Sequence, residues 1–221
     1  MFGVYTRVRR YSKNFIDFCK FTFYANKRHG KFIFNNEEYD YLIHPYNYTW
    51  RNERIVEIPI IEKILNRSKG KRILELGNVT SHYLKVNHTV LDKYEKADGV
   101  INKDIVDYKP KDKFDLIISI STLEHIGWDE NGDYRKILKA ISVLKKLLSK
   151  NGMLIFTHPL GYNFFMDEFL RKGKIKISKG YLIQRITGDN EWKQIPWKKQ
   201  LLRYHYPYAY ANGVLIGIIK K

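Results

Sequence analysis

Four short, nearly continuous apolar runs dominate the pattern of the chain from residue 71 onwards. They span residues 72–76, 89–92, 114–121 and 153–158. Runs of this length without regular polar alternation are typical of strands that are buried on both faces, as in a parallel sheet. The pattern therefore predicts an α/β fold with a mostly parallel central sheet.

A helix is predicted between the last two runs, within residues 134–152. Its apolar stripe consists of Ile137, Ile141, Leu144 and Leu148. Lysines cover the opposite side, and Gly152 is expected to follow the end of the helix. A strand–helix–strand unit of this kind implies a right-handed crossover with helices flanking the sheet.

The last two apolar segments, residues 181–186 and 213–220, are separated by a short polar and aromatic stretch. They are predicted to form an antiparallel pair at the C-terminal edge of the sheet.

Residues 1–66 are predicted to form an N-terminal extension that packs on a core domain of residues 67–221. Two β-rich runs around Asn35 and Asn36 indicate a hairpin in this extension. A helix is expected to follow within residues 52–65, although it contains a proline.

The first 30 residues are basic and aromatic, with apolar residues at helical spacing. They predict either a helix that packs on the domain or an amphipathic helix that rests on an anionic membrane surface.

The net charge of +17 is equally compatible with a solvated charged surface and with polyanionic partners such as nucleic acid, anionic lipid or phosphorylated small molecules. The single cysteine, Cys19, excludes an internal disulfide and a structural Cys-based zinc site. No apolar run approaches the roughly 20 residues of a membrane span. We therefore expect a cytoplasmic protein, with peripheral membrane contact left open.

Side chains suited to ligand binding follow the carboxyl ends of the predicted strands, where open α/β sheets bind their ligands. In chain order they are Glu75, Gly77 and Asn78, then Asp92, then Asp104 and Ile105, then Ser119, Ser121 and His125, and finally His158.

Over residues 71–160 the order of these segments resembles the class I S-adenosylmethionine-dependent methyltransferases. The segment 114–126, FDLIISISTLEHI, is the most specific match, because many small-molecule enzymes of this family have a strand that ends in Leu-Glu-His. The resemblance implies a Rossmann-like sheet with helices on both faces and S-adenosylmethionine as the cofactor. It also implies that Asp92 binds the ribose hydroxyls and that Asp104 and Ile105 flank the adenine. The other expected cofactor-binding residues are Glu75, Gly77, Asn78, Ser119 and Ser121.

The loop after the first strand departs from the family pattern of acid-x-Gly-x-Gly-x-Gly. Residues 75–81 read Glu-Leu-Gly-Asn-Val-Thr-Ser, so only Gly77 remains. Glycine permits close approach to a ligand and positive φ, whereas the β-branched Val79 resists positive φ. The loop is therefore expected either to take another path or to hold the cofactor further out.

A hydroxyl on a sugar, a glycan or another small molecule is the expected acceptor. The Asn/Asp-Pro-Pro-aromatic motif of base N-methylating enzymes is absent, since residues 119–125 read SISTLEH. Residues 157–163 are similar to a turn of methyltransferase-like proteins in surface-polysaccharide and glycan pathways.

His125 and His158 are the candidate catalytic bases for the acceptor proton, with packing and backbone-bonding roles as their alternatives. Trp128 and Tyr162 are the candidate substrate residues, because an aromatic ring can stack on a sugar, although both can equally be packing residues. No metal site is expected, since the acidic run at residues 129–130 is too short to predict one.

Two other functions stay open at this point. The basic surface is compatible with an RNA-modifying enzyme that binds phosphates. The altered loop is compatible with a non-catalytic binding protein on a methyltransferase scaffold.

Overall fold

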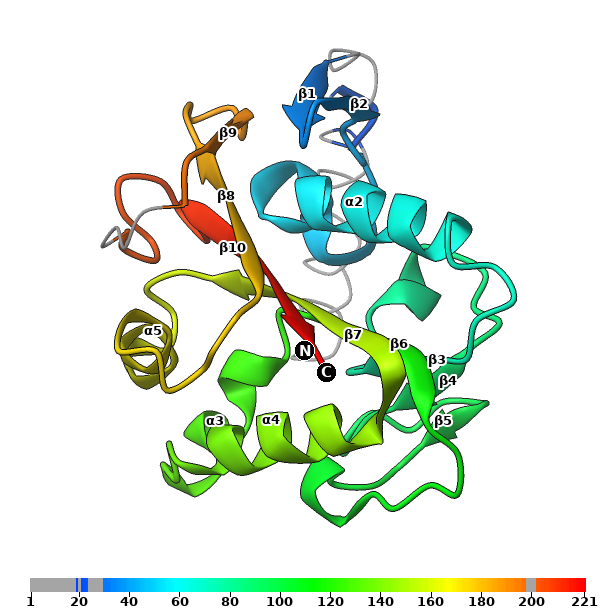
Figure 1. The fold of residues 1–221 in the computed structure, drawn as a ribbon. Helices are drawn as coiled ribbons and strands as arrows, with labels where there is room; N and C mark the ends of the chain where they lie inside the picture. The colour runs from blue at the N-terminus through cyan, green and yellow to red at the C-terminus, as the bar shows by residue number, and fades with distance from the viewer. Residues whose placement is uncertain (1–18, 20, 24–29, 198–201) are drawn as a thin grey trace, which may run out of the picture.

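A computed structural model describes residues 19, 21–23, 30–197 and 202–221 (Figure 1). The predicted N-terminal helix therefore falls almost entirely outside the described residues. Its two alternatives, packing on the domain or contact with a membrane surface, stay predictions.

One sheet of eight strands forms the centre of the molecule, in the order β5-β4-β3-β6-β7-β10-β8-β9. The strands are β3 (Ile73–Leu76), β4 (Thr89–Leu91), β5 (Val100–Ile101), β6 (Phe114–Ile120), β7 (Leu148–Pro159), β8 (Lys179–Arg185), β9 (Trp192–Ile195) and β10 (Gly213–Lys220). The five strands from β5 to β7 in this order pair in parallel. The predicted α/β fold with a mostly parallel sheet is confirmed.

The predicted antiparallel C-terminal pair forms between β8 and β10. β10 also pairs antiparallel with β7, so it lies between β7 and β8. A further strand, β9, pairs antiparallel with β8 and is the outermost strand on this side. The apolar pattern did not predict β9, because it is short and only Trp192 in it is buried.

The predicted helix after β6 is α4 (Lys136–Leu147), and its apolar stripe is buried. The prediction that Leu148 belongs to the stripe and that Gly152 follows the helix end is wrong. Leu148 has extended backbone (φ −68°, ψ 141°) and already pairs with Phe114 of β6. Burial of Leu148 in the sheet therefore ends the helix before the glycine.

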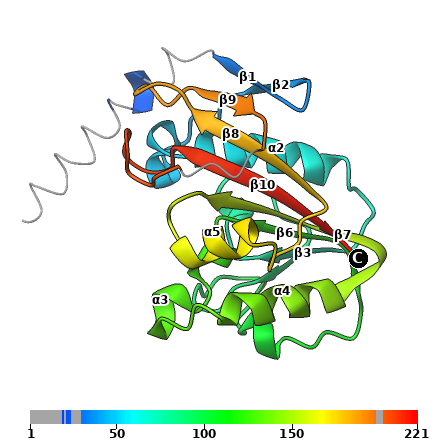
Figure 2. The same cartoon turned by 60° about the vertical axis from the view of Figure 1, so that its left-hand side comes forward.

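One face of the sheet is covered by α2 (Arg54–Asn66) and by the hairpin of β1 (Lys31–Phe34) and β2 (Glu37–Asp40) (Figure 2). The hairpin confirms the prediction, and Asn35 and Asn36 form its turn with φ of 52° and 62°. Asparagine tolerates this left-handed conformation better than most residues.

The proline in α2, Pro59, lies inside the helix and lacks the N–H that would bond to the carbonyl of Ile55. The N–H of Leu42 donates to that carbonyl instead, at 3.1 Å. The segment after the hairpin thus satisfies the acceptor that the proline leaves open. Residues 31–66 therefore pack directly on the sheet, while the domain boundary near residue 66 stays a prediction.

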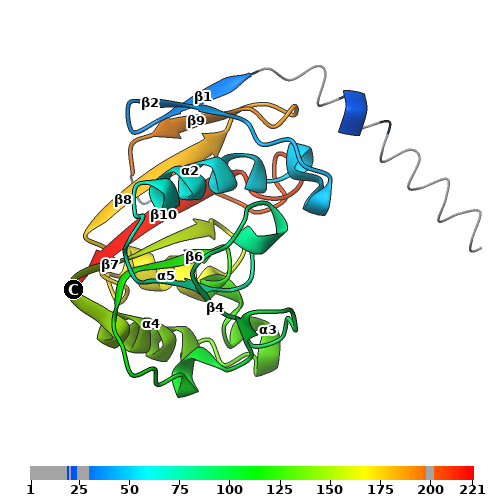
Figure 3. The same cartoon turned by 90° about the vertical axis from the view of Figure 1, so that its right-hand side faces the viewer.

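The opposite face is covered by α4 and α5 (Phe164–Arg171), so that helices lie on both faces (Figure 3). The short helix α3 (Trp128–Asn131) precedes α4. Four 3-10 helices complete the fold: η1 (Tyr46–Arg51), η2 (Thr80–His82), η3 (Ile105–Asp107) and η4 (Leu123–His125). The last three follow β3, β5 and β6, so the connections at these strand ends hold single turns.

Within the described part of the chain, no helix has the length and apolar character needed to cross a membrane.

Gly217 of β10 makes room for the ring of Phe156 on the neighbouring β7, because a Cβ at position 217 would overlap with that ring. We expect Gly217→Ala to lower the free energy of unfolding by about 1–3 kcal/mol, as overpacked cores do. Urea unfolding measures the change. Gly188→Ala is the matched control, since its Cβ would meet only Tyr208 at ordinary contact distance. Equal stability of the two variants would contradict this account. In the Gly217→Ala background, Phe156→Leu should recover part of the lost free energy of unfolding, because it removes the ring that the new Cβ would meet.

Candidate active site

A cavity of about 310 Å³ opens at the carboxyl ends of β3, β4 and β6. We call it the carboxyl-end cavity, and its wall consists of residues 76–77, 91–94, 103–105, 122, 125–126 and 129–130. Five of the predicted site residues lie in this wall: Gly77, Asp92, Asp104, Ile105 and His125. The topology thus brings together residues that the sequence places after four different strands.

Gly77 forms the turn that leaves β3, with φ of 88°. A Cβ at this position would overlap with the side chain of Thr122, which lies just beyond the end of β6. The N–H of Gly77 donates to the carbonyl of Leu91 at 2.9 Å, which ties the turn to the end of β4. The left-handed φ and the crowding both require glycine at this position.

The rest of the loop follows a path that needs no second glycine. Val79 has φ of −101° and ψ of −47°, which any residue can adopt. Its side chain packs on the α2 face of the sheet and is not part of the cavity wall. The loop therefore requires positive φ at Gly77 and not at Val79, while the position of a cofactor beside it stays a prediction.

Glu75 holds this path from within the protein, where it is fully buried. Its Oε1 accepts the N–H groups of Val79 (3.0 Å) and Thr80 (2.8 Å). Its Oε2 contacts the hydroxyl of Thr80 and lies 2.8 Å from Nε2 of His88. Glu75 therefore stabilises the loop through these hydrogen bonds. It lies outside the cavity wall, and a direct contact with a cofactor stays a prediction.

Asp92 lines the cavity and also accepts hydrogen bonds from the backbone of the two neighbouring loops. Its Oδ1 accepts the N–H groups of Tyr94 and Glu95, both at 2.8 Å. Its Oδ2 accepts the N–H of Asn78 at 3.0 Å. The Asn78 side chain donates to Glu95 (2.8 Å) and accepts from Ser81 (2.6 Å), outside the cavity wall.

Asp104 belongs to a cluster of four charges that the sequence analysis did not predict. Lys136 lies 2.7 Å from Asp104 and 2.5 Å from Glu130, and Lys93 lies 3.1 Å and 2.7 Å from the same two carboxylates. Burial opposes the charge of Asp104, but the bonds from Lys136 and from the N–H of Val106 keep its pKa below the usual value. No spacing in the sequence marks these partners, because Lys93 follows β4, Glu130 lies in α3 and Lys136 lies in α4.

His125 meets Asp129 and Tyr162 at the rim of the cavity. Its Nδ1 contacts Oδ2 of Asp129 and lies 3.1 Å from the hydroxyl of Tyr162, which is 3.3 Å from the same carboxylate. Burial and the Asp129 carboxylate raise the pKa of Tyr162 to about 12, so its hydroxyl is neutral at neutral pH. When Nδ1 carries the proton toward Asp129, Nε2 is the free acceptor of the ring.

His158 lies apart from this rim, fully buried in β7, with Nε2 2.8 Å from Asp167. Its Nδ1 lies 3.9 Å from Glu124, a buried carboxylate that the sequence analysis missed within the Leu-Glu-His triplet. Burial opposes the imidazolium, but Asp167 and Glu124 raise the pKa of His158 to about 9. Full burial and these two carboxylates set His158 apart from the half-exposed His125, and a catalytic role of either histidine stays a prediction.

Three further predicted residues also lie outside the cavity wall. Ser119 is buried within β6. The hydroxyl of Ser121 donates to Glu57 of α2 at 2.6 Å. Trp128 is 37% exposed and packs at an angle on Phe165. Their contacts with a cofactor or a substrate stay predictions.

The sequence matches no protein-family model and no curated protein. Among solved structures, an S-adenosylmethionine-dependent methyltransferase from Archaeoglobus fulgidus has a TM-score of 0.50 at 14% identity, covering 80% of this chain and 98% of that one. A possible histamine N-methyltransferase from Thermotoga maritima has a TM-score of 0.45 at 15% identity, covering 73% and 87%. The N-methyltransferase NodS from Bradyrhizobium japonicum, in complex with S-adenosyl-L-homocysteine, has a TM-score of 0.43 at 14% identity, covering 76% and 90%. The Archaeoglobus likeness shows that this chain has the Rossmann-like fold found in that methyltransferase.

The raised pKa of His158 predicts a pH dependence of stability. The folded-state pKa of about 9 exceeds the ordinary value of 6.5, so the stabilising contribution is complete below pH 6.5 and is lost as the pH rises to about 9. We expect it to reach about 3 kcal/mol. Urea unfolding between about pH 6 and pH 9 should show this slope in the wild type and not in His158→Gln.

Asp167→Asn is the second variant for this test. It retains the imidazole but removes the bonded carboxylate, so the loss of stability should move to lower pH. An unchanged slope in both variants would show that another group titrates.

Proposed function

We propose that the protein is an S-adenosylmethionine-dependent methyltransferase. The observation that carries the proposal is the carboxyl-end cavity, which gathers the Gly77 turn, Asp92, and the Asp104–Ile105 pair in one wall. Nothing in the local sequence forces these segments together, and sheet order alone aligns them. This is the edge at which open α/β sheets bind their ligands.

The residues present fit an adenosyl group. A carboxylate has about four acceptor sites, and the three backbone bonds to Asp92 leave capacity for a ribose hydroxyl. Ile105 and Leu91 are buried apolar residues of the wall, which suits an aromatic base. Oδ1 of Asp104 accepts the N–H of Val106 at 3.2 Å and can accept a second hydrogen bond, from the exocyclic amine of adenine. The missing Cβ at Gly77 keeps the turn clear.

The acceptor in this proposal is a hydroxyl of a sugar, a glycan or another small molecule. S-adenosylmethionine, when bound, supplies a methyl group on a positively charged sulfur. His125, half-exposed at the rim and oriented by Asp129, would accept the hydroxyl proton at Nε2. Tyr162, whose hydroxyl lies 3.1 Å from Nδ1 of His125, and the exposed Trp128 would contact the acceptor through their rings. Cytoplasmic location stays part of the proposal.

Asp92→Ala tests the cofactor site. We expect it to weaken S-adenosylmethionine binding at least about tenfold, because a charged acceptor for a ribose hydroxyl is lost. Calorimetry on the purified full chain measures the affinity, and a melting curve monitors the loops that Asp92 holds. Asp98→Ala is the control, since it removes an equal charge from an exposed position nearby. Absence of wild-type binding would overturn the proposal.

His125→Gln tests the base. We expect turnover to fall about 100-fold or more while the affinity for S-adenosylmethionine changes by less than about threefold. The release of S-adenosylhomocysteine with a panel of oligosaccharide acceptors measures turnover. Tyr162→Phe retains the ring and should cause a smaller loss. Binding of the cofactor without turnover on any acceptor would instead favour a non-catalytic binding protein.

A further inference from the structure

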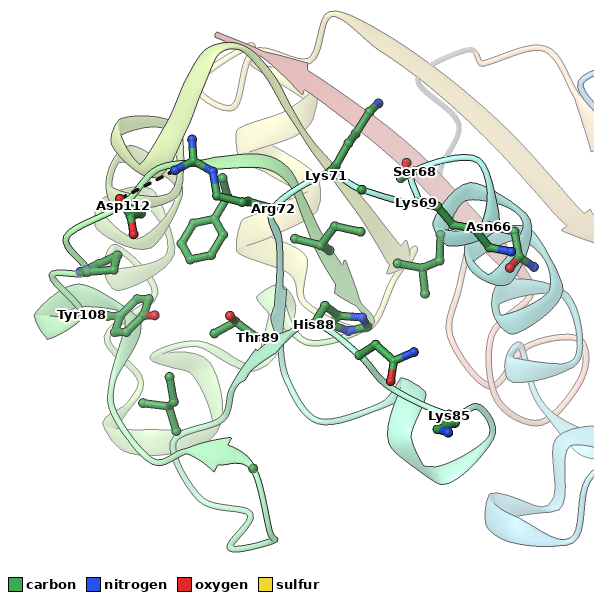
Figure 4. A pocket seen from close by; sticks show the side chains of 18 of the residues that line it. Asn66, Ser68, Lys69, Lys71, Arg72, Lys85, His88, Thr89, Tyr108 and Asp112 are labelled. Carbon is green, nitrogen blue, oxygen red and sulfur yellow. Dashed lines mark ion pairs between the residues drawn. The ribbon is translucent and has the colours of Figure 1, made fainter.

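A second and larger cavity lies at the opposite edge of the sheet. It measures about 960 Å³ and is formed at the amino ends of β3, β4 and β6 (Figure 4). We call it the basic cavity, and its wall consists of residues 65–66, 68–73, 85, 87–89, 99, 101, 108, 110–112 and 114. Because four separate stretches of chain surround it, the cavity is a feature of the fold and not of a single loop.

Cations outnumber anions in this wall by five to one. The single carboxylate is Asp112, which lies 3.6 Å from Arg72. The other four cations are exposed and make no ion pair within 4.0 Å with any carboxylate of the described residues. They are Lys69, Lys71, Lys85 and Lys111.

The contrast with the carboxyl-end cavity shows that this imbalance is local. There, Lys93 and Lys136 each lie within 3.1 Å of two carboxylates. A lysine that is neutralised by neighbours adds little to the field outside the protein, whereas four unpaired lysines around one hollow reinforce each other. The basic cavity is therefore the one of the two that attracts an anion.

The floor of the basic cavity supplies contacts of another kind. His88 and Thr89 lie near its middle, and Lys71 and Lys85 lie at different margins (Figure 4). Tyr108 and Ile73 add partly buried apolar surface. A concave site of this size that combines apolar surface with cations at its margins has the character of a small-molecule site.

We infer that the basic cavity binds a small molecule that carries two or more phosphate groups. Four unpaired cations match the charge of a diphosphate, and lysine is a common ligand of phosphate. The hollow is lined by four separate segments of the chain, which suits a compact ligand, whereas a nucleic acid strand would need a groove that continues along the surface. The inference does not depend on the cavity at the carboxyl ends or on its proposed activity.

Inorganic pyrophosphate is the probe for this site, used with the full chain at low ionic strength and measured by calorimetry. We expect a dissociation constant below about 1 mM that rises steeply with salt. The double variant Lys71→Gln/Lys85→Gln removes charges from two walls of the cavity and should weaken binding at least about tenfold. Both side chains are exposed, so the variant should melt at the temperature of the wild type.

The matched control is Lys139→Gln/Lys145→Gln, which removes the same charge from exposed positions on α4. It should leave the affinity for pyrophosphate within about twofold of the wild type. Absence of pyrophosphate binding, or equal weakening by both double variants, would overturn the inference. So would tighter binding of a single-stranded RNA oligonucleotide that both variants weaken alike, since this would indicate a diffuse nucleic-acid surface. Asp92→Ala should leave pyrophosphate binding intact, which separates this result from the proposed activity.

Discussion

The buried carboxylate of Glu75 is the interaction that holds together the loop after β3 and the segment before β4. Burial of an ionised carboxylate is unfavourable unless several donors compensate for the lost water. Glu75 obtains them from the N–H groups of Val79 and Thr80 and from a contact with His88. His88 lies in the wall of the basic cavity, and Val79 follows the Gly77 turn of the other cavity. One residue of β3 therefore fixes structure at both edges of the sheet.

The same carboxylate explains how the loop after β3 manages with a single glycine. A backbone that must curl around a ligand needs positive φ at several positions, and glycine meets that need. Here the buried Glu75 carboxylate accepts the N–H groups of Val79 and Thr80, and Val79 has a right-handed conformation. The Val79 side chain then joins the core on the α2 face instead of filling the cavity. In this loop Gly77 alone must be glycine, because its φ is positive and a Cβ would overlap with the side chain of Thr122.

The parts of the structure that follow from local patterns were predictable from the sequence. The buried strands and α4 follow from the spacing of apolar residues. The principle that open α/β sheets bind ligands at the carboxyl ends of their strands led to Gly77, Asp92 and His125. What the sequence did not reveal depends on distant segments. The lysine partners of Asp104, the bond from Leu42 that tolerates a proline in α2, and the outermost strand β9 all arise from contacts between remote positions. The helix end at Leu147 was missed because strand pairing of Leu148 overrode the glycine signal.

The distribution of charge carries more information than its total. A net charge of +17 by itself favours no particular partner, since solvated lysines produce the same sum. Two groups of these lysines lie at the two cavities and differ in their partners. Those beside Asp104 and Glu130 are neutralised in place and serve to shape a wall. Those around the amino ends of the strands are exposed and lie within 4.0 Å of no carboxylate among the described residues, so their charge acts on the solvent side of the cavity. A bound polyanion would neutralise this positive charge, which is why we assign a phosphorylated ligand to the basic cavity and not to the carboxyl-end cavity.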